Sequence, residues 1–337
     1  MDWIDGLLIP AVGSLVVIVG LLMGGYAYMT LAERKVSGRF TLRYGPNRAG
    51  PFGLLQPVAD AFKMIFKEEI IPSEVDKPIY LMAPGLAVFA ALSAFAVVPL
   101  GTSFTLFGRE IHLYLADVNV GLLYLAAVAG VGVYSIILGG WSSNNNFSFL
   151  GALRTSAQVI AYEIPMGLAL VSLAAVAGSL SLVDIVDFQA RSHLPLILFQ
   201  PLGFLIYFIC GLTEANRSPF DLPETENELV AGYTTEYGGI KFALFFMAEY
   251  VNMVVISCIT TALFLGGGKW PFVNPHPLVS LVLFAAKTSL IIFLFLWIRA
   301  SLPRVRYDKN MKFNWTFMLP LSLFNLAATA VGVVLWG

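Results

Sequence analysis

Four ionisable side chains lie inside long apolar stretches of this sequence, where a charge is costly. A charged residue at the centre of a bilayer costs at least about 2.5–3.5 kcal/mol, so each of them needs a partner or a function. Counted from the basic side of the membrane, they are Glu214 at the mouth, then Glu163, Glu249 and Lys287 at depths of about 10, 13 and 18 Å. Carboxylates in such a line can pass protons through water, which predicts a proton path. The alternative is a structural ion pair in which Lys287 neutralises Glu249 or Glu163.

A strongly acidic segment, residues 214–228, separates two of these apolar stretches. Its charge contradicts the basic character of the other loops on its side of the membrane. Pro219, Phe220 and Pro223 place rigid and aromatic residues among the acids, which is typical of an ordered loop rather than a flexible tail. The alternative is that the acidic residues simply form a surface exposed to water. The acidic residues of the loop are Asp221, Glu224, Glu226, Glu228 and Glu236.

The elements that carry these residues must be membrane-spanning helices. The 337 residues are 58% hydrophobic and only 12% charged, whereas soluble domains carry about 25% charge. Crossing about 30 Å of hydrocarbon takes roughly 20 apolar residues in a helix, which satisfies its own backbone polar groups. We therefore predict an all-α integral membrane protein with eight transmembrane helices. Their approximate bounds are Leu7–Leu31, Ile79–Leu100, Asn119–Gly140, Ser156–Gly178, Leu194–Glu214, Ile240–Leu265, Pro277–Arg299 and Phe313–Trp336.

One further apolar pattern is too short and too polar to cross the membrane. Between Leu54 and Lys67 apolar residues recur every three or four positions, which predicts an amphipathic interfacial helix around Val58–Phe66. It either lies flat at the lipid headgroups or forms the lip of an opening for a lipid-like molecule, with Asp60 and Lys63 facing a polar cavity. The whole chain is then one polytopic membrane domain. Its cytoplasmic loops are predicted at 32–78, 141–155, 215–239 and 300–312.

The basic residues orient these helices. Of the 20 Lys and Arg residues, 16 lie in four loops on one side, which the positive-inside rule makes cytoplasmic. An even number of helices then places both termini on the outer, periplasmic side. The first segment has no basic leader and no small-residue cleavage site, so we expect it to remain as a helix. The expected location is the bacterial inner (plasma) membrane rather than the mitochondrial inner membrane.

Residues that bind redox cofactors are scarce. His112, His193 and His276 lie at or beyond the outer ends of helices, so no helix pair can supply two histidines to a haem. Cys210 and Cys258 are isolated inside apolar segments, where a structural thiol is the common role. Such isolated residues supply neither an iron–sulfur cluster nor a zinc site. We predict that this chain binds no haem, iron–sulfur or metal cofactor.

Four motifs stand on the cytoplasmic side of the predicted helices. They are Ala32-Glu33-Arg34-Lys35 with Arg43-Tyr44-Gly45-Pro46-Asn47-Arg48-Ala49-Gly50, Ser143-Asn144-Asn145 with Gly151-Ala152-Leu153-Arg154 and Ala157-Gln158, Asn216-Arg217-Ser218-Pro219-Phe220-Asp221-Leu222-Pro223-Glu224 with Glu228-Leu229-Val230-Ala231-Gly232, and Arg299-Ala300-Ser301-Leu302-Pro303-Arg304 with Arg306-Tyr307-Asp308. Together they resemble the NuoH family of membrane subunits of respiratory complex I, the proton-pumping NADH:quinone oxidoreductase. The resemblance extends from about Glu33 to Pro320. One departure is Thr41, where the family often has Gln.

The resemblance implies a subunit at the junction of the membrane and hydrophilic arms, with no catalytic activity of the isolated chain. Its helices would enclose a chamber that admits a quinone substrate (ubiquinone or menaquinone), while electrons arrive from iron–sulfur clusters on neighbouring subunits. Expected partners are hydrophilic quinone-reducing and iron–sulfur subunits, small and antiporter-like membrane subunits, and the lipid bilayer, but no nucleic acid. The implied chamber residues are Glu33, Arg34, Arg43, Asp60, Lys63, Phe220, Asp221, Glu224, Glu226 and Glu228, and the implied proton path comprises Glu163, Glu214, Glu249 and Lys287.

Two other functions fit parts of the sequence. A homologous anchor of a membrane-bound hydrogenase, or of a ferredoxin- or coenzyme F420-linked complex, would share the membrane chemistry but not a bilayer quinone as acceptor. The full motif Arg43-Tyr44-Gly45-Pro46-Asn47-Arg48 and the amphipathic helix favour the quinone-reactive complex. A stand-alone cation or proton transporter would use the buried Glu and Lys residues alone. Such transporters commonly contain two similar halves, and this sequence shows no clear internal repeat.

Overall fold

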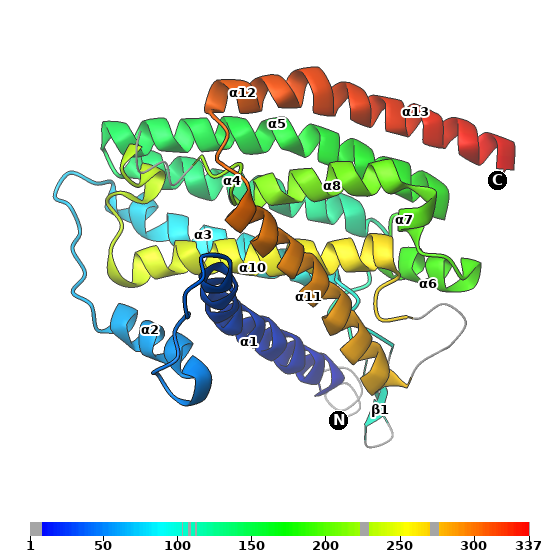
Figure 1. Ribbon diagram of the computed structural model, residues 1–337, viewed down its shortest axis with the longest axis horizontal. Helices are drawn as coiled ribbons and strands as arrows, with labels where there is room; N and C mark the ends of the chain where they lie inside the picture. The colour runs from blue at the N-terminus through cyan, green and yellow to red at the C-terminus, as the bar shows by residue number, and fades with distance from the viewer. Residues whose placement is uncertain are drawn as a thin grey trace.

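The chain folds into a bundle of long helices, with α1 and α11 running obliquely across the others (Figure 1). The computed structural model describes residues 9–102, 104–106, 109–111, 113–222, 229–269 and 276–336. The helices are α1 (Ile9–Phe40), α2 (Gln56–Ile65), α3 (Lys77–Ala94), α4 (Gly121–Ser142), α5 (Asn146–Ala177), α6 (Leu182–Ser192), α7 (Leu196–Phe199), α8 (Pro201–Glu214), α10 (Gly239–Leu265), α11 (Pro277–Ser301), α12 (Tyr307–Phe313) and α13 (Leu319–Trp336). Short turns are η2 (Pro51–Gly53), η3 (Phe95–Val97), η4 (Gly232–Thr234) and the π-helical η5 (Asn314–Met318).

Six helices within the described residues are long and apolar enough to cross a membrane. They confirm an integral membrane protein built mainly of helices. Two other predicted spans, Leu7–Leu31 and Leu194–Glu214, fall on α1 and on α7 with α8. The 14 residues of α8 cover about 21 Å at 1.5 Å per residue, short of a full bilayer crossing. The six helices are Lys77–Val97, Gly121–Ser142, Asn146–Ala177, Gly239–Leu265, Pro277–Ser301 and Tyr307–Leu335.

Two helices extend well beyond the apolar stretches that predict them. α1 continues past Leu31 to Phe40, so its charged residues are helical, and α5 begins at Asn146 rather than near Ser156. Most of 141–155, predicted as a loop, is therefore helix. The physical reason is that hydropathy marks only the part of a helix inside the membrane, while Glu, Arg and Lys are good helix formers in water.

A small β-hairpin departs from the all-α prediction. Strands β1 (Phe104–Leu106) and β2 (Arg109–Ile111) pair antiparallel, with Phe104 opposite Ile111. Each strand has only three residues, which is too short for alternating apolar and polar positions to reveal it in the sequence. The predicted spans also did not include α6, which lies between α5 and α7 in the chain.

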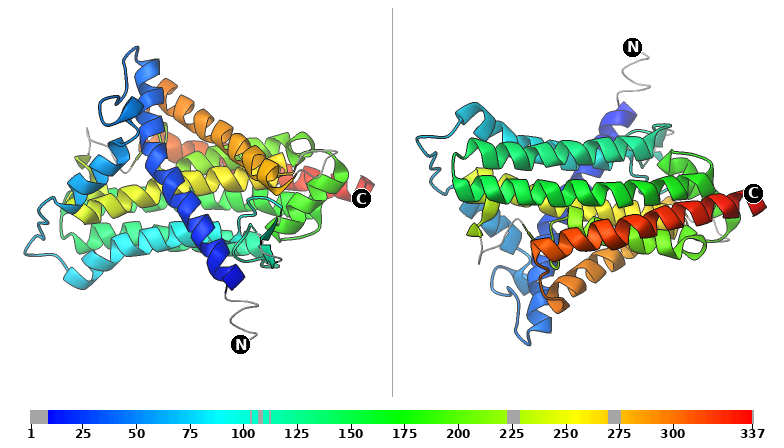
Figure 2. Two further views of the ribbon diagram at one scale, coloured as in Figure 1. Left: turned by 90° about the horizontal axis from the view of Figure 1, so that it is seen from below. Right: turned by 90° about the horizontal axis from the view of Figure 1, so that it is seen from above.

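α10 is the central helix of the bundle. It packs against α1, α3, α8 and α11, and most of its residues from Val251 to Phe264 are buried. Figure 2 shows α4, α5 and α13 side by side on one face, while α1 lies on the opposite face. This arrangement places the ionisable residues of α10 inside the protein rather than against lipid.

Local sequence explains where the longest helices begin and end. The side chain of Asn145 accepts a hydrogen bond from the Phe147 amide and caps α5, which ends at Gly178 with φ of 72°. α10 ends in the same way at Gly266, with φ of 74°. Glycine adopts this left-handed conformation without the steric cost that a side chain adds.

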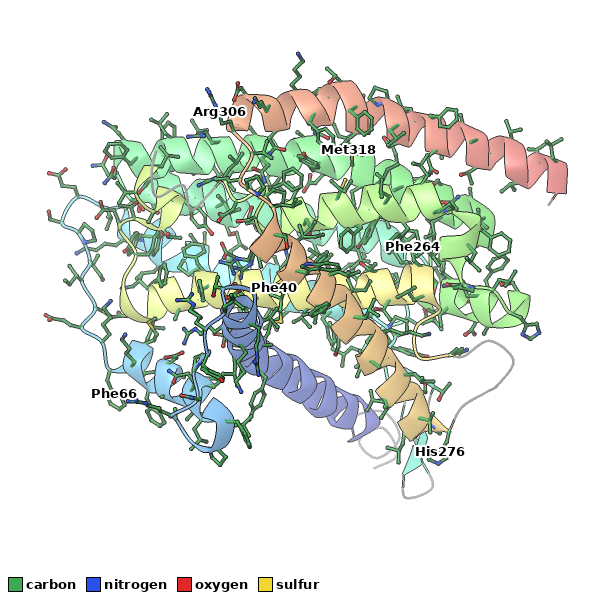
Figure 3. All side chains as sticks on the ribbon, in the orientation of Figure 1. Phe40, Phe66, Phe264, His276, Arg306 and Met318 are labelled. Carbon is green, nitrogen blue, oxygen red and sulfur yellow. The ribbon has the colours of Figure 1, made fainter. Side chains whose placement is uncertain are left out.

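The predicted amphipathic helix is present as α2. None of its residues is buried, and Phe62 stacks on Phe66 at 6.1 Å between ring centroids. Figure 3 shows Phe66 at the edge of the molecule, where 79% of it is exposed. The apolar face of α2 is therefore available to lipid or to an amphipathic ligand.

Candidate functional site

A cavity of about 100 Å³ lies among α3, α4, α5, α8 and α10. Its wall is largely apolar, but Glu214 at the end of α8 and Glu249 in α10 both line it. Asn216 and Asn252 line it too, and Asn252 Nδ2 donates to the backbone carbonyl of Glu214 at 3.4 Å. Tyr233 donates its hydroxyl to Glu249 Oε1 at 3.2 Å. A cavity with such polar groups can hold water, through which protons move.

Glu163 adds a third carboxylate. It lies in α5, which packs against α8, and its carboxyl group is close enough to that of Glu214 for their charges to interact. Glu163 Oε1 is buried and has no hydrogen-bond partner within the described residues. A water molecule or a proton would satisfy such an oxygen. Glu214 and Glu249 thus line the same cavity. Glu163 lies near enough to Glu214 for an electrostatic interaction between the two carboxyl groups.

A second ionic group lies near the C-terminal end of α1. Glu33 is only 6% exposed, and its Oε1 lies 3.6 Å from Arg217 Nη1. Arg299, from α11, forms a second ion pair with the same oxygen. The Arg217 guanidinium also stacks over the ring of Tyr250 at 4.2 Å from its centroid. We call Glu33, Arg217, Arg299 and Tyr250 the Glu33 cluster.

The Glu33 cluster and the cavity share two short stretches of chain. Glu214 lines the cavity, and Arg217, three residues later, belongs to the cluster. On α10, Glu249 lines the cavity, and the next residue, Tyr250, supports Arg217. A change of charge at the cluster therefore acts on the same backbone segments that carry the cavity carboxylates.

A surface ion pair joins α1 to α2. Arg34 Nη1 lies 2.7 Å from Asp60 Oδ2, and Gln56 Nε2 donates to Asp60 Oδ1 at 2.9 Å. Such an exposed pair contributes about 0–1 kcal/mol, so it holds α2 only weakly. Lys63, predicted with Asp60 to face a cavity, is exposed on α2.

Arg43 lies apart from the Glu33 cluster. It is exposed, and its Nε donates to Thr41 Oγ1 at 3.0 Å. Thr41 in turn donates to the Ser37 carbonyl at 2.9 Å. Thr41, the departure from the family pattern, therefore makes a local polar contact at the end of α1.

The first half of the acidic loop is anchored to α5. Phe220 is buried and packs against Tyr162 at 5.6 Å between ring centroids, and its carbonyl accepts from Gln158 Nε2 at 2.8 Å. The Pro219 carbonyl accepts from the Val305 amide at 3.0 Å. These contacts confirm an ordered segment at 215–222, and Asp221 is half-buried there. Three predicted chamber residues, Glu224, Glu226 and Glu228, lie outside the described residues.

Lys287 is not brought to the carboxylates. Its Nζ donates to the carbonyls of Leu265, Gly267 and Lys269 at 2.7, 2.9 and 3.1 Å. Leu265 ends α10, and Glu249 lies roughly 24 Å from it along that helix at 1.5 Å per residue. A cation at a helix C-terminus complements the helix dipole. The contacts therefore favour a structural role at the C-terminal end of α10.

Replacing Lys287 with Met should destabilise the assembled protein by about 1–3 kcal/mol, because three partly buried carbonyl groups lose their donor. Thermal denaturation in detergent measures this, with K287R as the variant that keeps the charge. Unchanged thermal stability together with lost proton pumping would instead assign Lys287 to the proton path.

The groups that could hold a metal ion are also separated. Within the described ranges no three His, Cys, Asp or Glu side chains converge. Cys210 and Cys258 are buried and unpaired in α8 and α10. His193 and His276 lie at the end of α6 and the start of α11, on the side that the sequence assigns to the outside.

Sequence reasoning missed the partners of Glu33 and of Glu249. Arg217 and Arg299 stand in two of the cytoplasmic motifs, but nothing in the sequence shows that both turn toward one carboxylate. The requirement that a buried charge be paired was the available signal. Nothing in the sequence identifies Tyr233 as the partner of Glu249, since aromatic residues are common in loops.

Comparison with known proteins gives the same assignment as the motifs. A family model described as NADH dehydrogenase matches residues 13–330. The NADH-quinone oxidoreductase H subunit of Thermomicrobium roseum is 48% identical, and the match covers 100% of this chain and 99% of that protein. The H subunit of the enzyme from Protochlamydia amoebophila is 47% identical over 90% of this chain and 91% of its own length. This chain belongs to the H-subunit family of NADH-quinone oxidoreductase.

Membership of the H-subunit family confirms the resemblance carried by the four motifs. A further relative, the second NADH-quinone oxidoreductase H subunit of Syntrophobacter fumaroxidans, is 45% identical over 100% of this chain and 99% of that protein. The family match at residues 13–330 includes α2, the Glu33 cluster and the cavity. All of the geometry described above therefore lies in the part of the chain that matches the family.

Proposed function

We propose that this chain is the complex I membrane subunit that forms the quinone-access chamber and the start of the proton path. The observation that carries this proposal is the junction between the Glu33 cluster and the cavity. Glu214 and Arg217 lie on one segment, and Glu249 and Tyr250 are adjacent on α10. A quinone that changes its charge near the cluster can therefore act directly on the carboxylates.

The chamber would lie at the inner ends of α1 and α11, beside α2. Reduction of a quinone to a quinol takes up two electrons and two protons, and the electrons would come from iron–sulfur clusters of partner subunits. The reduced quinone is transiently anionic, and a site that holds Arg217 and Arg299 against one carboxylate would respond to that charge. The exposed apolar face of α2 suits the isoprenoid tail of a substrate arriving from the bilayer.

The proton path would begin at Glu214 and include Glu163 and Glu249. Each lies on a helix that packs inside the bundle, where an isolated charge would be unfavourable. The balance between the protonated and ionised forms is therefore sensitive to neighbouring charge, and coupling of this kind is reciprocal. Quinone reduction would alter proton occupancy in the cavity, and proton occupancy would alter the response to quinone.

The proposed topology has eight spans. α1 and α7 with α8 would supply the two beyond the six that meet the length and hydropathy criteria. Both termini would face the periplasm, and the chain would reside in a bacterial inner membrane. The cytoplasmic face, with the acidic loop and the α1–α2 segment, would bind the hydrophilic subunits, and antiporter-like subunits would continue the path within the membrane.

The test is to purify a tagged chain gently from its native membrane. We expect flavin and iron–sulfur subunits to co-purify, with inhibitor-sensitive NADH:quinone reduction in the eluate, and mass spectrometry to identify the subunits. Co-purifying nickel–iron hydrogenase subunits would replace the proposal with the hydrogenase anchor. A chain that purifies alone and exchanges ions in vesicles would replace it with a transporter.

A further inference from the structure

Tyr233 connects the acidic loop to a cavity carboxylate. It is only 2% exposed, lines the cavity and donates its hydroxyl to Glu249 Oε1 at 3.2 Å. Its ring packs edge-on against Phe245, with centroids 5.2 Å apart and planes at 80°. Tyr233 lies in η4, five residues after Glu228.

The backbone that carries Tyr233 is held tightly against α5. A Cβ atom added to Gly151 would lie 2.7 Å from the Cα of Gly232, so the two glycines are in direct backbone contact. Gly232 itself has φ of 57°, a conformation that favours glycine. The Tyr233 side chain therefore projects from a fixed point, and its hydroxyl position is set by the packing of η4 against α5 and α4.

The chemistry of this contact depends on the state of Glu249. An ionised carboxylate only accepts hydrogen bonds, so the Tyr233 hydroxyl must donate to it. A protonated carboxyl group can donate instead, and the phenol oxygen can accept. The same pair of side chains thus makes different hydrogen bonds before and after proton transfer.

We infer that Tyr233 is a positioning residue that holds the Glu249 carboxylate in place in the cavity. This inference rests on the proposed function, in which Glu249 carries protons. Tyr233 does not react itself. It orients the carboxylate through the hydrogen bond from its hydroxyl group.

Tyr237 provides a matched control for the hydroxyl group. Its ring packs against the same Phe245, with centroids 4.9 Å apart and planes at 83°. Its hydroxyl instead lies 3.3 and 3.4 Å from the carbonyls of Tyr80 and Gly139. Burial raises the pKa of Tyr237, so its hydroxyl group stays protonated. Replacing either tyrosine with Phe removes one oxygen and leaves the aromatic packing in place.

The experiment compares Y233F, Y237F, E249Q and both double variants, Y233F/E249Q and Y237F/E249Q, in the assembled complex. We expect Y233F to lower coupled quinone reduction about fivefold, as the loss of one hydrogen bond predicts. Y237F should retain it, and NADH oxidation by a hydrophilic acceptor should not change in any variant. In the E249Q background, Y233F should have no further effect, because a positioning residue cannot act once its carboxylate is gone.

Each outcome has a distinct meaning. Wild-type coupling in Y233F, an equal loss in Y237F, or an additive loss in Y233F/E249Q would overturn the role of Tyr233 while leaving the proton path intact. Full proton pumping in E249Q would overturn the proposed function of Glu249 itself. Assembly on native gels shows that every variant compared is a folded complex.

Discussion

Replacing Glu163 or Glu249 with Gln is expected to stop proton pumping and to lower coupled quinone reduction. The amide keeps the size and much of the hydrogen bonding of the carboxylate but cannot carry a proton. A positioned acid or base typically contributes 10²–10⁴-fold to proton transfer, so we expect at least about a 10²-fold slower coupled reaction. Proton uptake into proteoliposomes measures pumping, and reduction of a hydrophilic acceptor by NADH, which bypasses the quinone, should be unaffected.

Glu236 supplies the control for these substitutions. It is a half-buried glutamate of the acidic loop whose Oε1 accepts from Asn145 Nδ2 at 2.6 Å, and it does not line the cavity. E236Q should pump protons as the wild type does. Normal pumping by both E163Q and E249Q would remove these two residues from the path.

Replacing Glu33 with Leu is expected to prevent assembly of the complex. The substitution removes from Arg217, which is 4% exposed, and from Arg299 the carboxylate that they share. Removing one partner of a buried ion pair typically costs about 3–5 kcal/mol, because the remaining buried charge loses its counter-ion. That loss is a large part of the stability of a typical domain.

The neighbouring Arg34 tests whether burial is the cause. Its ion pair with Asp60 is exposed, so R34Q should cost no more than about 1 kcal/mol and the complex should still assemble. Native gels and the yield of purified complex measure both variants. Normal assembly of E33L would show that the Glu33 cluster does not hold α1, α11 and the acidic loop together.

Much of the architecture follows from hydropathy, because helices in lipid need long apolar stretches. Six of the predicted spans coincide with long apolar helices. The ends of α1 and α5 could not be predicted in this way, since a helix continues into water wherever its residues favour it. The three-residue strands β1 and β2 are likewise too short to give a sequence pattern.

The sequence predicts those residues of the candidate site whose burial in an apolar helix is energetically costly. Glu163, Glu214 and Glu249 stand out because an acid in an apolar helix needs a reason to be there. The partners do not stand out. Glu33 and Arg299 are separated by most of the chain, and only the packing of α1 against α11 brings them together. The contacts of Lys287 could not be predicted either, because depth along a helix does not reveal which neighbour a side chain faces.

Quinone binding is tested most directly by photolabelling the intact complex with a photoreactive quinone, followed by peptide mapping of this chain. We predict label within residues 33–66 and 217–222, at the Glu33 cluster and α2, with labelling prevented by excess unmodified quinone. Label confined to other subunits, or label in this chain that excess quinone does not prevent, would contradict a quinone chamber formed by this protein.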